Sequence, residues 1–532
     1  MITNLALVTI IVLVALYEIV ICKGINRKID TKEIVAVSAF FFVAVALFFA
    51  ITGLYTSGYH LTDDHDVYSL GRKLSDQGFF TTVRGRIVED AFSRFRPLYW
   101  TLRIIQVSIF GDDFVAWHIM YAFLSAVNLC LGYFYARYRG CMILPSFVFA
   151  VSLFKGSEQT PIMWRLGPQE NLGILIVLLT FIFLRLYHDK RKTSYLILSI
   201  IFTLSTALIK EAFLLIVPAY PVILVIWNAV ESDSFSFRDV VSWIRRDIKY
   251  TAVVILTFVS CIAVILICVG DTYRISEHKG IIGIIKAMYD TYIGGIGIYV
   301  RLAAVAIILG FSELTVVCKE KMTPRVKAFL CGTLVLLACL CLQFYLHADV
   351  GMTERYLVPS TLMISLFVYV FVNCLYMGSS NGSKLYYYMF VAISGYVLFM
   401  NLPDQYYAEE FTRNGHEITA CLARIGELAS EDTPILVDLD YEEDKSASIY
   451  LEEKYGVNSV YNVNYSPNVD GRFHDVYNPS SMEDDSISET DAKIMLVYTG
   501  DDGDIVKKRG ASDRYRTEDF GSFTLYIKER TR

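Results

Sequence analysis

Three carboxylates and an imidazole stand together in the run Asp63-Asp64-His65-Asp66, inside a long polar segment of an otherwise apolar chain. A carboxylate can remove a proton from a hydroxyl group, and clustered carboxylates can bind cations. Charges close to lipid are costly, so they generally mark sites that handle protons, cations or phosphorylated substrates. The run therefore predicts a site for one of these chemistries.

Basic side chains are the second feature of the same segment, residues 55–112. They are Arg72, Lys73, Arg84, Arg86, Arg94, Arg96 and Arg103. One interpretation is that they contact lipid head groups. The other is that some bind an anionic ligand, above all a phosphate, because a planar guanidinium group matches two phosphate oxygens. Arg94 and Arg96 are the candidates for phosphate binding.

Apolar helices must position these residues. Hydrophobic residues make up 55% of the 532 and the mean hydropathy is +0.45, values typical of an integral membrane protein. Apolar runs occur at 4–22, 34–54, 113–135, 141–155, 169–187, 194–209, 212–230, 250–270, 293–311, 327–346, 355–377 and 385–402. We predict a polytopic α-helical membrane protein with about twelve spans.

The basic loops orient these spans. Lys23, Arg27, Lys28 and Lys32 fill the first loop, and the later basic loops fall on the same face when the spans are counted. Loops rich in Lys and Arg face the cytoplasm. Both termini, the acidic run and everything after 402 are therefore expected on the extracytoplasmic side of a cell membrane, which we take to be bacterial.

Residues 403–532 differ sharply from the rest of the chain. They contain 28 Asp/Glu against 14 Lys/Arg, a net charge of −14, which leaves +8 on residues 1–402. The sequence thus predicts two domains. One is a membrane domain, 1–402, with an outer loop at 55–112, and the other is a soluble extracytoplasmic domain, 403–532, large enough to bury its own core.

The pattern of the soluble domain predicts a small α/β fold. Apolar residues at helical spacing indicate a helix over 411–430, and a second helix is expected over 446–455. Short apolar runs predict strands at 435–437, 457–461, 494–498 and 523–527, and the polar stretch 466–491 predicts a loop. The alternation favours a partly parallel sheet.

Two surface helices are expected within the outer loop. Val67, Leu70 and Leu74 have the spacing of a short helix with Asp63 or Asp64 near its start. The aromatic-rich stretch 97–110 is shorter than a span, so it is expected to lie along the membrane surface.

The order of these features resembles the GT-C superfamily of polyprenyl-phosphate-dependent glycosyltransferases, in the branch of protein mannosyltransferases and aminoarabinose transferases. Asp64 with Tyr68 is similar to the acidic motif of that family's first outer loop. The run Arg96-Pro97-Leu98-Tyr99-Trp100 is similar to its basic, proline and aromatic motif, with Arg in place of a family Lys and with a single proline. The resemblance covers about residues 50–140.

Two further stretches fit the same resemblance. Trp164-Arg165-Leu166-Gly167-Pro168-Gln169-Glu170 resembles a Gly-Pro-x-Glu element, and Glu354-Arg355-Tyr356-Leu357-Val358-Pro359 resembles an Arg-Tyr-x-x-Pro element that opens a late span. Counting spans places both on the face expected for Asp64.

The resemblance implies an inverting transfer of a sugar from a polyprenyl-phosphate donor to an acceptor. Asp64 would be the general base, with Asp63 and Asp66 as the other catalytic candidates. Arg94, Arg96 and Arg355 would bind the donor phosphate. The remaining pocket candidates are Tyr68, Arg165, Glu170, Lys210, Glu211 and Tyr356. The acceptor is left open as a glycan, a lipid or a protein, and no nucleic acid is expected.

A metal cofactor is not expected. Three Asp beside a phosphate could hold a divalent cation, but the branch that the chain resembles works without one. His60 and His65 lack the spacing of a metal site, and the eleven cysteines show no paired spacing.

Several candidates also have a purely structural interpretation. Asp63 or Asp66 could cap the short helix, since Asp is strongly preferred at helix starts. Lys210 and Glu211, which join two apolar runs, could form an ion pair within a tight turn. Glu170 stands at the head of an apolar run, where a charge favours a functional interpretation.

Three other functions compete with sugar transfer. A secondary transporter would also have many spans, yet such proteins often contain internal repeats, and none is visible between 1–200 and 201–402. A lipid-linked glycan polymerase or ligase usually places its largest outer loop late in the chain, whereas here it follows the second span. A scaffold without activity would leave Asp64 structural.

Overall fold

The computed structural model describes residues 29–91, 94–155, 160–232, 234–269, 289, 297–314, 323–347, 354–373, 381–400, 404–430, 433–439, 441–457, 459–462, 472–475, 486–488, 492–499 and 515–528. The predicted span at 4–22 lies outside these residues.

Contacts divide the chain into two compact units. The helical unit comprises Met1–Phe48, Arg84–Leu102 and Tyr121–Gln405, and the sheet unit comprises Phe49–Val83, Arg103–Met120 and Tyr406–Arg532. Two segments of the outer loop thus group with the C-terminal residues, whereas hydropathy placed them with the membrane domain. The acidic run belongs to the sheet unit, and Arg94 and Arg96 belong to the helical unit.

Six helices among the described residues are long and apolar enough to cross a membrane. They are α2 (Thr31–Ile51), α6 (Phe114–Tyr138), α8 (Glu170–Lys190), the pair α10 (Glu211–Leu214) and α11 (Ala219–Ser232), α13 (Ile248–Val264) and α16 (Pro324–His347). The chain is therefore an integral membrane protein.

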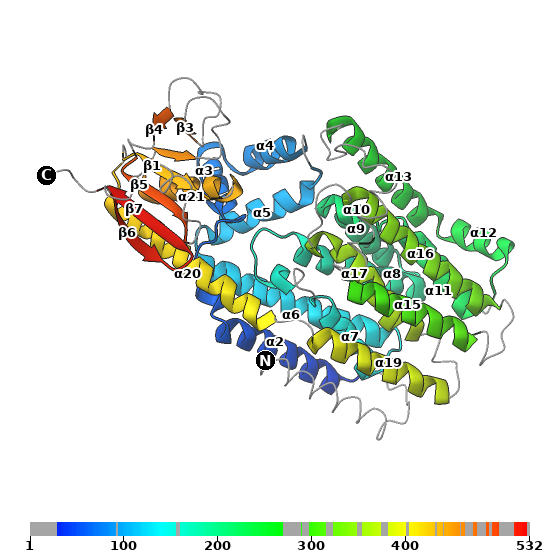
Figure 1. Ribbon diagram of the computed structural model, residues 1–532. Helices are drawn as coiled ribbons and strands as arrows, with labels where there is room; N and C mark the ends of the chain where they lie inside the picture. Colours follow the sequence, from blue (N-terminus) through cyan, green and yellow to red (C-terminus); the bar gives the residue numbers. More distant parts are fainter. Residues whose placement is uncertain are drawn as a thin grey trace. The chain divides into compact units, whose positions relative to one another are not determined.

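Further helices stand at the other described apolar runs. They are α7 (Ile143–Ser152), α9 (Thr193–Ile209), α15 (Gly297–Ser312), α17 (Val358–Ser365), which a π turn continues over Leu366–Phe371, and α19 (Asn381–Met400). In the helical unit α8 packs on α9, α9 packs on α13, and α11 packs on α16 (Figure 1). The span count of about twelve stays a prediction.

Short helices build the outer loop. They are α3 (His65–Gln77), α4 (Phe79–Ala91) and α5 (Pro97–Phe110). The helices predicted from Val67, Leu70 and Leu74 and from the stretch 97–110 are confirmed. A further polar helix, α12 (Phe237–Arg246), begins with a capping box between Ser236 and Asp239.

The described strands form one seven-stranded sheet in the order β4-β3-β2-β1-β5-β7-β6. The strands are β1 (Ile435–Asp438), β2 (Val460–Asn462), β3 (Arg472–Asp475), β4 (Ser486–Ser488), β5 (Ile494–Tyr498), β6 (Tyr515–Phe520) and β7 (Phe523–Lys528). β1 pairs in parallel with β2 and β5, and the other pairs are antiparallel. The partly parallel sheet is confirmed, but the prediction of a loop throughout 466–491 is wrong, because β3 and β4 lie within it.

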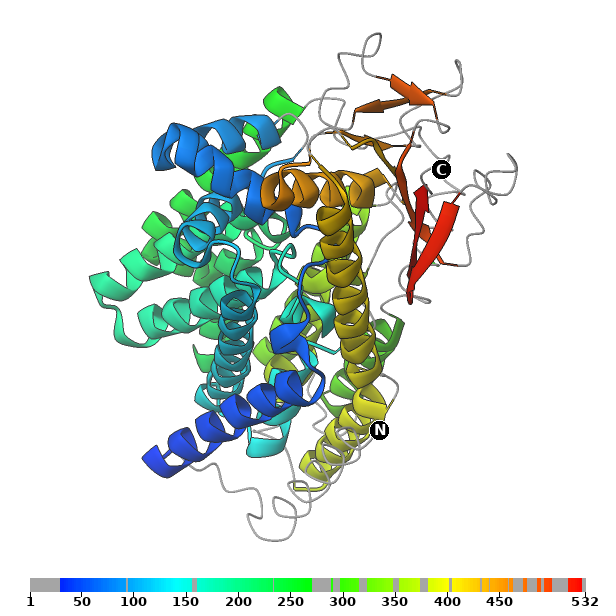
Figure 2. The ribbon, with the colours of Figure 1, turned by 90° about the vertical axis from the view of Figure 1, so that its left-hand side faces the viewer.

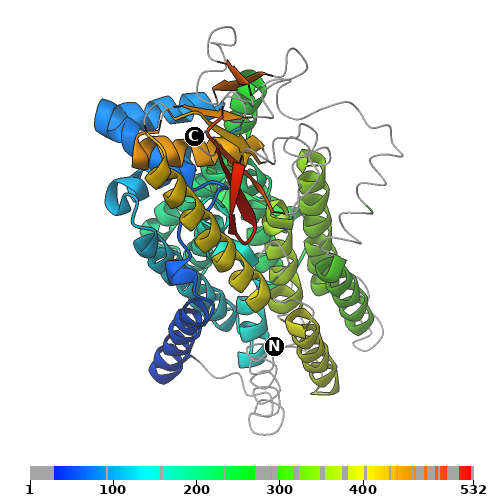
Figure 3. The same cartoon turned by 60° about the vertical axis from the view of Figure 1, so that its left-hand side comes forward.

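Two helices cover one face of this sheet, α20 (Asp404–Leu428) and α21 (Tyr441–Tyr455) (Figure 2). Their buried side chains share one core with alternate residues of the central strands, such as Ile435 and Val437 of β1. Tyr59 and Leu61 of the outer loop complete the same core. The β6–β7 hairpin lies beside α20 (Figure 3), where Arg424 donates to Glu518.

Candidate functional site

The acidic run forms a tight turn at the start of α3. Asp63 has a left-handed backbone, with φ of 72°, a conformation that Asp tolerates better than most residues. Asp64 occupies the N-cap position of α3, is 2% exposed, and makes no side-chain capping bond. The interpretation of Asp63 or Asp66 as the helix cap is therefore wrong. Asp66 is buried in the first turn, 4.0 Å from the His65 ring.

The carboxylate of Asp64 is held by the backbone just before it. Its Oδ2 accepts a hydrogen bond of 3.0 Å from the His60 N–H. The His60 ring in turn lies 3.3 Å from the Ser57 hydroxyl. A carboxylate oxygen that accepts a peptide N–H bond still has lone-pair capacity, so such a group can also accept a proton from a hydroxyl group.

Tyr68, one turn into α3, belongs to an aromatic group. Its ring packs edge-on to Tyr59 and Tyr450 and tilts against Phe114. Among the described residues its buried hydroxyl has no hydrogen-bond partner. Burial raises the pKa of Tyr68, so the hydroxyl stays protonated and can donate to a ligand.

In the helical unit, two buried ion pairs join segments far apart in sequence. Arg94 donates to Glu211 through Nε at 2.9 Å and also through Nη2, and Lys210 donates to Glu170. Both glutamates and Lys210 are at most 2% exposed. The interpretation of Lys210 and Glu211 as partners in a turn is therefore wrong. Lys210 is a single extended residue between α9 and α10, and successive side chains of an extended chain point apart.

The ring of Tyr356 lies among three cations. Lys210 Nζ is 4.3 Å from the ring centroid, and the guanidinium carbons of Arg355 and Arg94 are 5.3 and 5.7 Å away. These distances suit attraction between a cation and an aromatic face. Arg355 also acts electrostatically on Glu170. We call the six residues Arg94, Glu170, Lys210, Glu211, Arg355 and Tyr356 the Tyr356 cluster.

The Tyr356 cluster carries an excess of positive charge. It holds three cations and two carboxylates, which leaves one positive charge over. Its carboxylates stand at the first residues of α8 and α10. A cluster with two arginines suits a phosphate or another anion, since guanidinium groups form paired hydrogen bonds with such oxygens.

Arg96 has a separate partner that the sequence reasoning missed. It donates to the buried Asp90 through Nη2 at 2.5 Å and Nε at 3.2 Å, and its guanidinium carbon lies 5.2 Å from the Trp100 ring. The guanidinium carbon of Arg86 lies 3.9 Å from the centroid of the same ring. Asp90 follows from no periodic pattern, and its only signal is a carboxylate six residues before a basic motif.

Changing Arg96 to lysine is expected to slow the sugar transfer that the sequence resemblance implies by about tenfold. That factor corresponds to the loss of one charged hydrogen bond. Lysine keeps the charge but loses the fork that holds Asp90 and the flat group that stacks on Trp100. Product formed by equal amounts of protein in membranes is the measurement. Equal rates for Arg96 and lysine would show that charge alone is needed.

The segment around Arg165 is held by side chains of α5 and α6. Tyr99 donates to the Gly167 carbonyl at 3.1 Å, and Tyr121 donates to the Leu166 carbonyl at 2.7 Å. These bonds fix the chain that leads into Glu170. The Arg165 side chain is half-buried, and its backbone N–H donates to Pro161.

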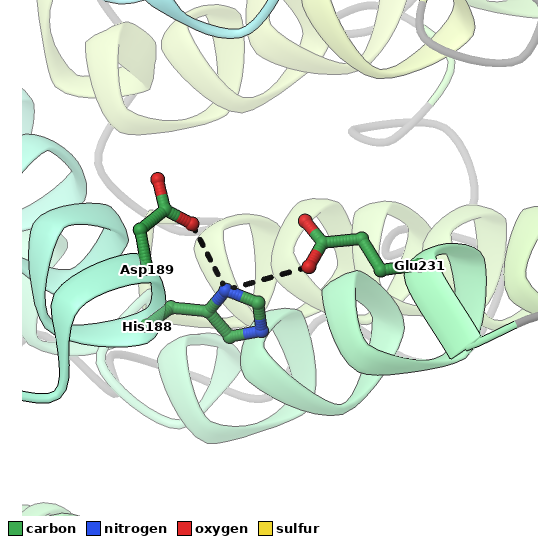
Figure 4. A group of neighbouring side chains, drawn as sticks. All are labelled: His188, Asp189 and Glu231. Atoms are coloured by element: carbon green, nitrogen blue, oxygen red, sulfur yellow. Dashed lines mark hydrogen bonds and ion pairs between the residues drawn. The ribbon is translucent and has the colours of Figure 1, made fainter.

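A different polar group has metal-ligand residue types, His188 and Asp189 at the end of α8 and Glu231 in α11 (Figure 4). His188 Nδ1 lies 3.3 Å from Asp189 and 3.8 Å from Glu231. Arg185 already bridges the two carboxylates, at 2.9 Å and 2.6 Å. Its guanidinium supplies the positive charge that a metal would bring, so we interpret the group as an ion-pair network.

Ten of the twelve predicted site residues thus fall into two groups, and Arg96 and Arg165 lie outside both. Asp63, Asp64, Asp66 and Tyr68 come together in the sheet unit, and the Tyr356 cluster comes together in the helical unit. From the sequence we also predict that Asp64 faces Arg96, Glu170 or Arg355 across an outer cavity. Asp64 and these three residues belong to different units, and this stays a prediction.

In comparisons with known proteins, the matches found are to solved structures. No protein-family model and no curated protein matches the sequence. Among solved structures the chain is similar to ArnT from Cupriavidus metallidurans bound to undecaprenyl phosphate, at 10% identity and a TM-score of 0.47, over 92% of this chain and 98% of that one. The apo state of the same protein matches at 12% identity and a TM-score of 0.46, over 92% and 97%.

Proposed function

We propose that this protein is a membrane glycosyltransferase that moves a sugar from a polyprenyl-phosphate donor to an acceptor on the extracytoplasmic face. The observation that carries the proposal is the Tyr356 cluster, in which three cations surround one aromatic ring at the ends of apolar helices. A lipid with an anionic head group would suit the Tyr356 cluster for two reasons. Its charged group can bind the cations, and its tail can lie against the apolar helices.

The cations would act on the leaving group. When the bond between the sugar and the phosphate breaks, negative charge grows on the departing phosphate oxygens. Arg94 and Arg355 are arginines near that place, and preorganised cations stabilise developing charge more than water does. Arg96, held by Asp90, would add to the same field.

Asp64 would act on the acceptor. As general base it would take the proton of the attacking hydroxyl, while the polyprenyl phosphate leaves from the opposite side of the anomeric carbon, which inverts that centre. A positioned base typically contributes ~10²–10⁴-fold. Tyr68 would donate its hydroxyl to the bound sugar or acceptor.

Neither step requires a metal ion. The arginines and Lys210 supply positive charge at the phosphate, and the carboxylate supplies the base. We therefore propose transfer without a divalent cation and with a glycan, lipid or protein as the acceptor.

The experiment that tests the proposal compares cells with and without this chain. Mass spectrometry of glycans, lipids and proteins in the envelope is expected to reveal one sugar-modified species that depends on the chain, together with build-up of a polyprenyl-phosphate sugar when the chain is absent. Unchanged profiles combined with chain-dependent uptake of a labelled solute into vesicles would instead favour a transporter.

A further inference from the structure

The backbone just before the acidic run is seated on helix α20 of the C-terminal region. We call residues 57–66 the acidic loop. At Gly415 of α20, an added Cβ would overlap the Ser57 carbonyl oxygen and the His60 ring, so only glycine allows this approach. On the loop side Gly58 has φ of 83°, and a Cβ there would lie 2.6 Å from the Thr419 hydroxyl. Two glycines thus permit one close contact between segments about 360 residues apart.

Thr419 binds both polar groups of one loop residue. Its hydroxyl accepts from the Tyr59 N–H at 2.9 Å and donates to the Tyr59 carbonyl at 3.4 Å. The Tyr59 side chain is 1% exposed, its hydroxyl bonds to Ser446 of α21, and its ring lies 4.3 Å from that of Tyr450. Tyr59 is therefore held at the backbone by α20 and at the side chain by α21.

His60, the next residue of the acidic loop, contacts both α20 and Asp64. The His60 ring stacks on Phe411 of α20, with centroids 3.5 Å apart and planes 13° from parallel. The His60 N–H is the donor to the Asp64 carboxylate. Only the Tyr59–His60 peptide unit separates Thr419 and Phe411 from the hydrogen bond that fixes Asp64.

We propose that helix α20 positions the catalytic carboxylate, with Thr419, Gly415 and Phe411 as positioning residues that act through Tyr59 and His60. This inference rests on the proposed function for the role of Asp64. It assigns the C-terminal region a part in catalysis itself.

The test uses the full-length protein and two readouts. Thr419→Val keeps the shape and removes the hydroxyl, Thr419→Ser restores it, and Ala420→Ser changes the exposed neighbour as a control. Hydrogen exchange of a peptide covering Tyr59 and His60 is expected to quicken about tenfold in Thr419→Val, because the Tyr59 N–H loses its acceptor. The amount of chain-dependent product is expected to fall by a similar factor, while the unfolding temperature falls by only a few degrees (about 2–4 °C).

Thr419→Ser should return both readouts to wild type, since it restores the donor and the acceptor. Gly415→Ala should quicken exchange and lower product at least as much as Thr419→Val, and it should also lower the unfolding temperature, because its Cβ would overlap the Ser57 carbonyl. Gly71→Ala in α3, where a Cβ meets open space, should have none of these effects. Wild-type exchange in Thr419→Val, or product loss that serine does not rescue, would overturn the inference. If Asp64→Asn leaves product unchanged, the proposed function fails, whereas the exchange data still decide whether α20 holds the loop.

Discussion

Replacing Asp64 by asparagine is expected to reduce transfer by ~10²–10⁴-fold, the range that a positioned general base contributes. Asparagine has the same shape, and its oxygen can accept the hydrogen bond that the His60 N–H now donates to Asp64. The loop should therefore keep its conformation while the proton acceptor is lost. The measurement is chain-dependent product per amount of protein in membranes.

Asp63→Asn is the matched control for this change. Asparagine also tolerates the left-handed backbone at residue 63, so folding should be preserved. We expect a much smaller loss than for Asp64→Asn, because the buried, backbone-fixed carboxylate is the one at 64. An equal loss in Asp63→Asn would move the base to Asp63, and wild-type product from Asp64→Asn would leave the acidic run structural.

Hydropathy predicted most of the helices because apolar runs in a membrane protein have few alternatives to helix. The run at 169–187 became α8, Glu170–Lys190, and the stretch 97–110 became α5 with the same ends. Polar segments carry no such signal. The strands β3 and β4 were missed because their sequences, such as Arg472–Asp475, lack the apolar alternation that marks a half-buried strand.

Residue types identified the charged candidates but not their partners. The partner of Lys210 is 40 residues away and that of Arg94 is 117 residues away, so local spacing suggested the wrong pairing of Lys210 with Glu211. Likewise, the role of Tyr59 depends on Thr419 and Ser446, which only the fold brings to it. Pairings of this kind depend on tertiary structure and leave no periodic trace in one sequence.

Removing Lys210 should both destabilise the protein and abolish transfer. Lys210→Met leaves Glu170 with no donor at Oε1, and its Oε2 already lacks a hydrogen-bond partner among the described residues. Breaking a buried ion pair from one side typically costs ~3–5 kcal/mol, since the remaining charge stays buried. Denaturant unfolding of the detergent-solubilised protein would measure the loss.

The double change Lys210→Met with Glu170→Gln separates stability from function. It removes both charges, so most of the unfolding free energy should return, because a buried pair contributes little beyond what neutral groups of similar size provide. Transfer should stay low, because one of the three cations around Tyr356 is still missing. Recovery of both stability and transfer would show that Lys210 serves only to neutralise Glu170. Donor phosphate binding would then depend on Arg94 and Arg355, the two cations that remain beside the ring.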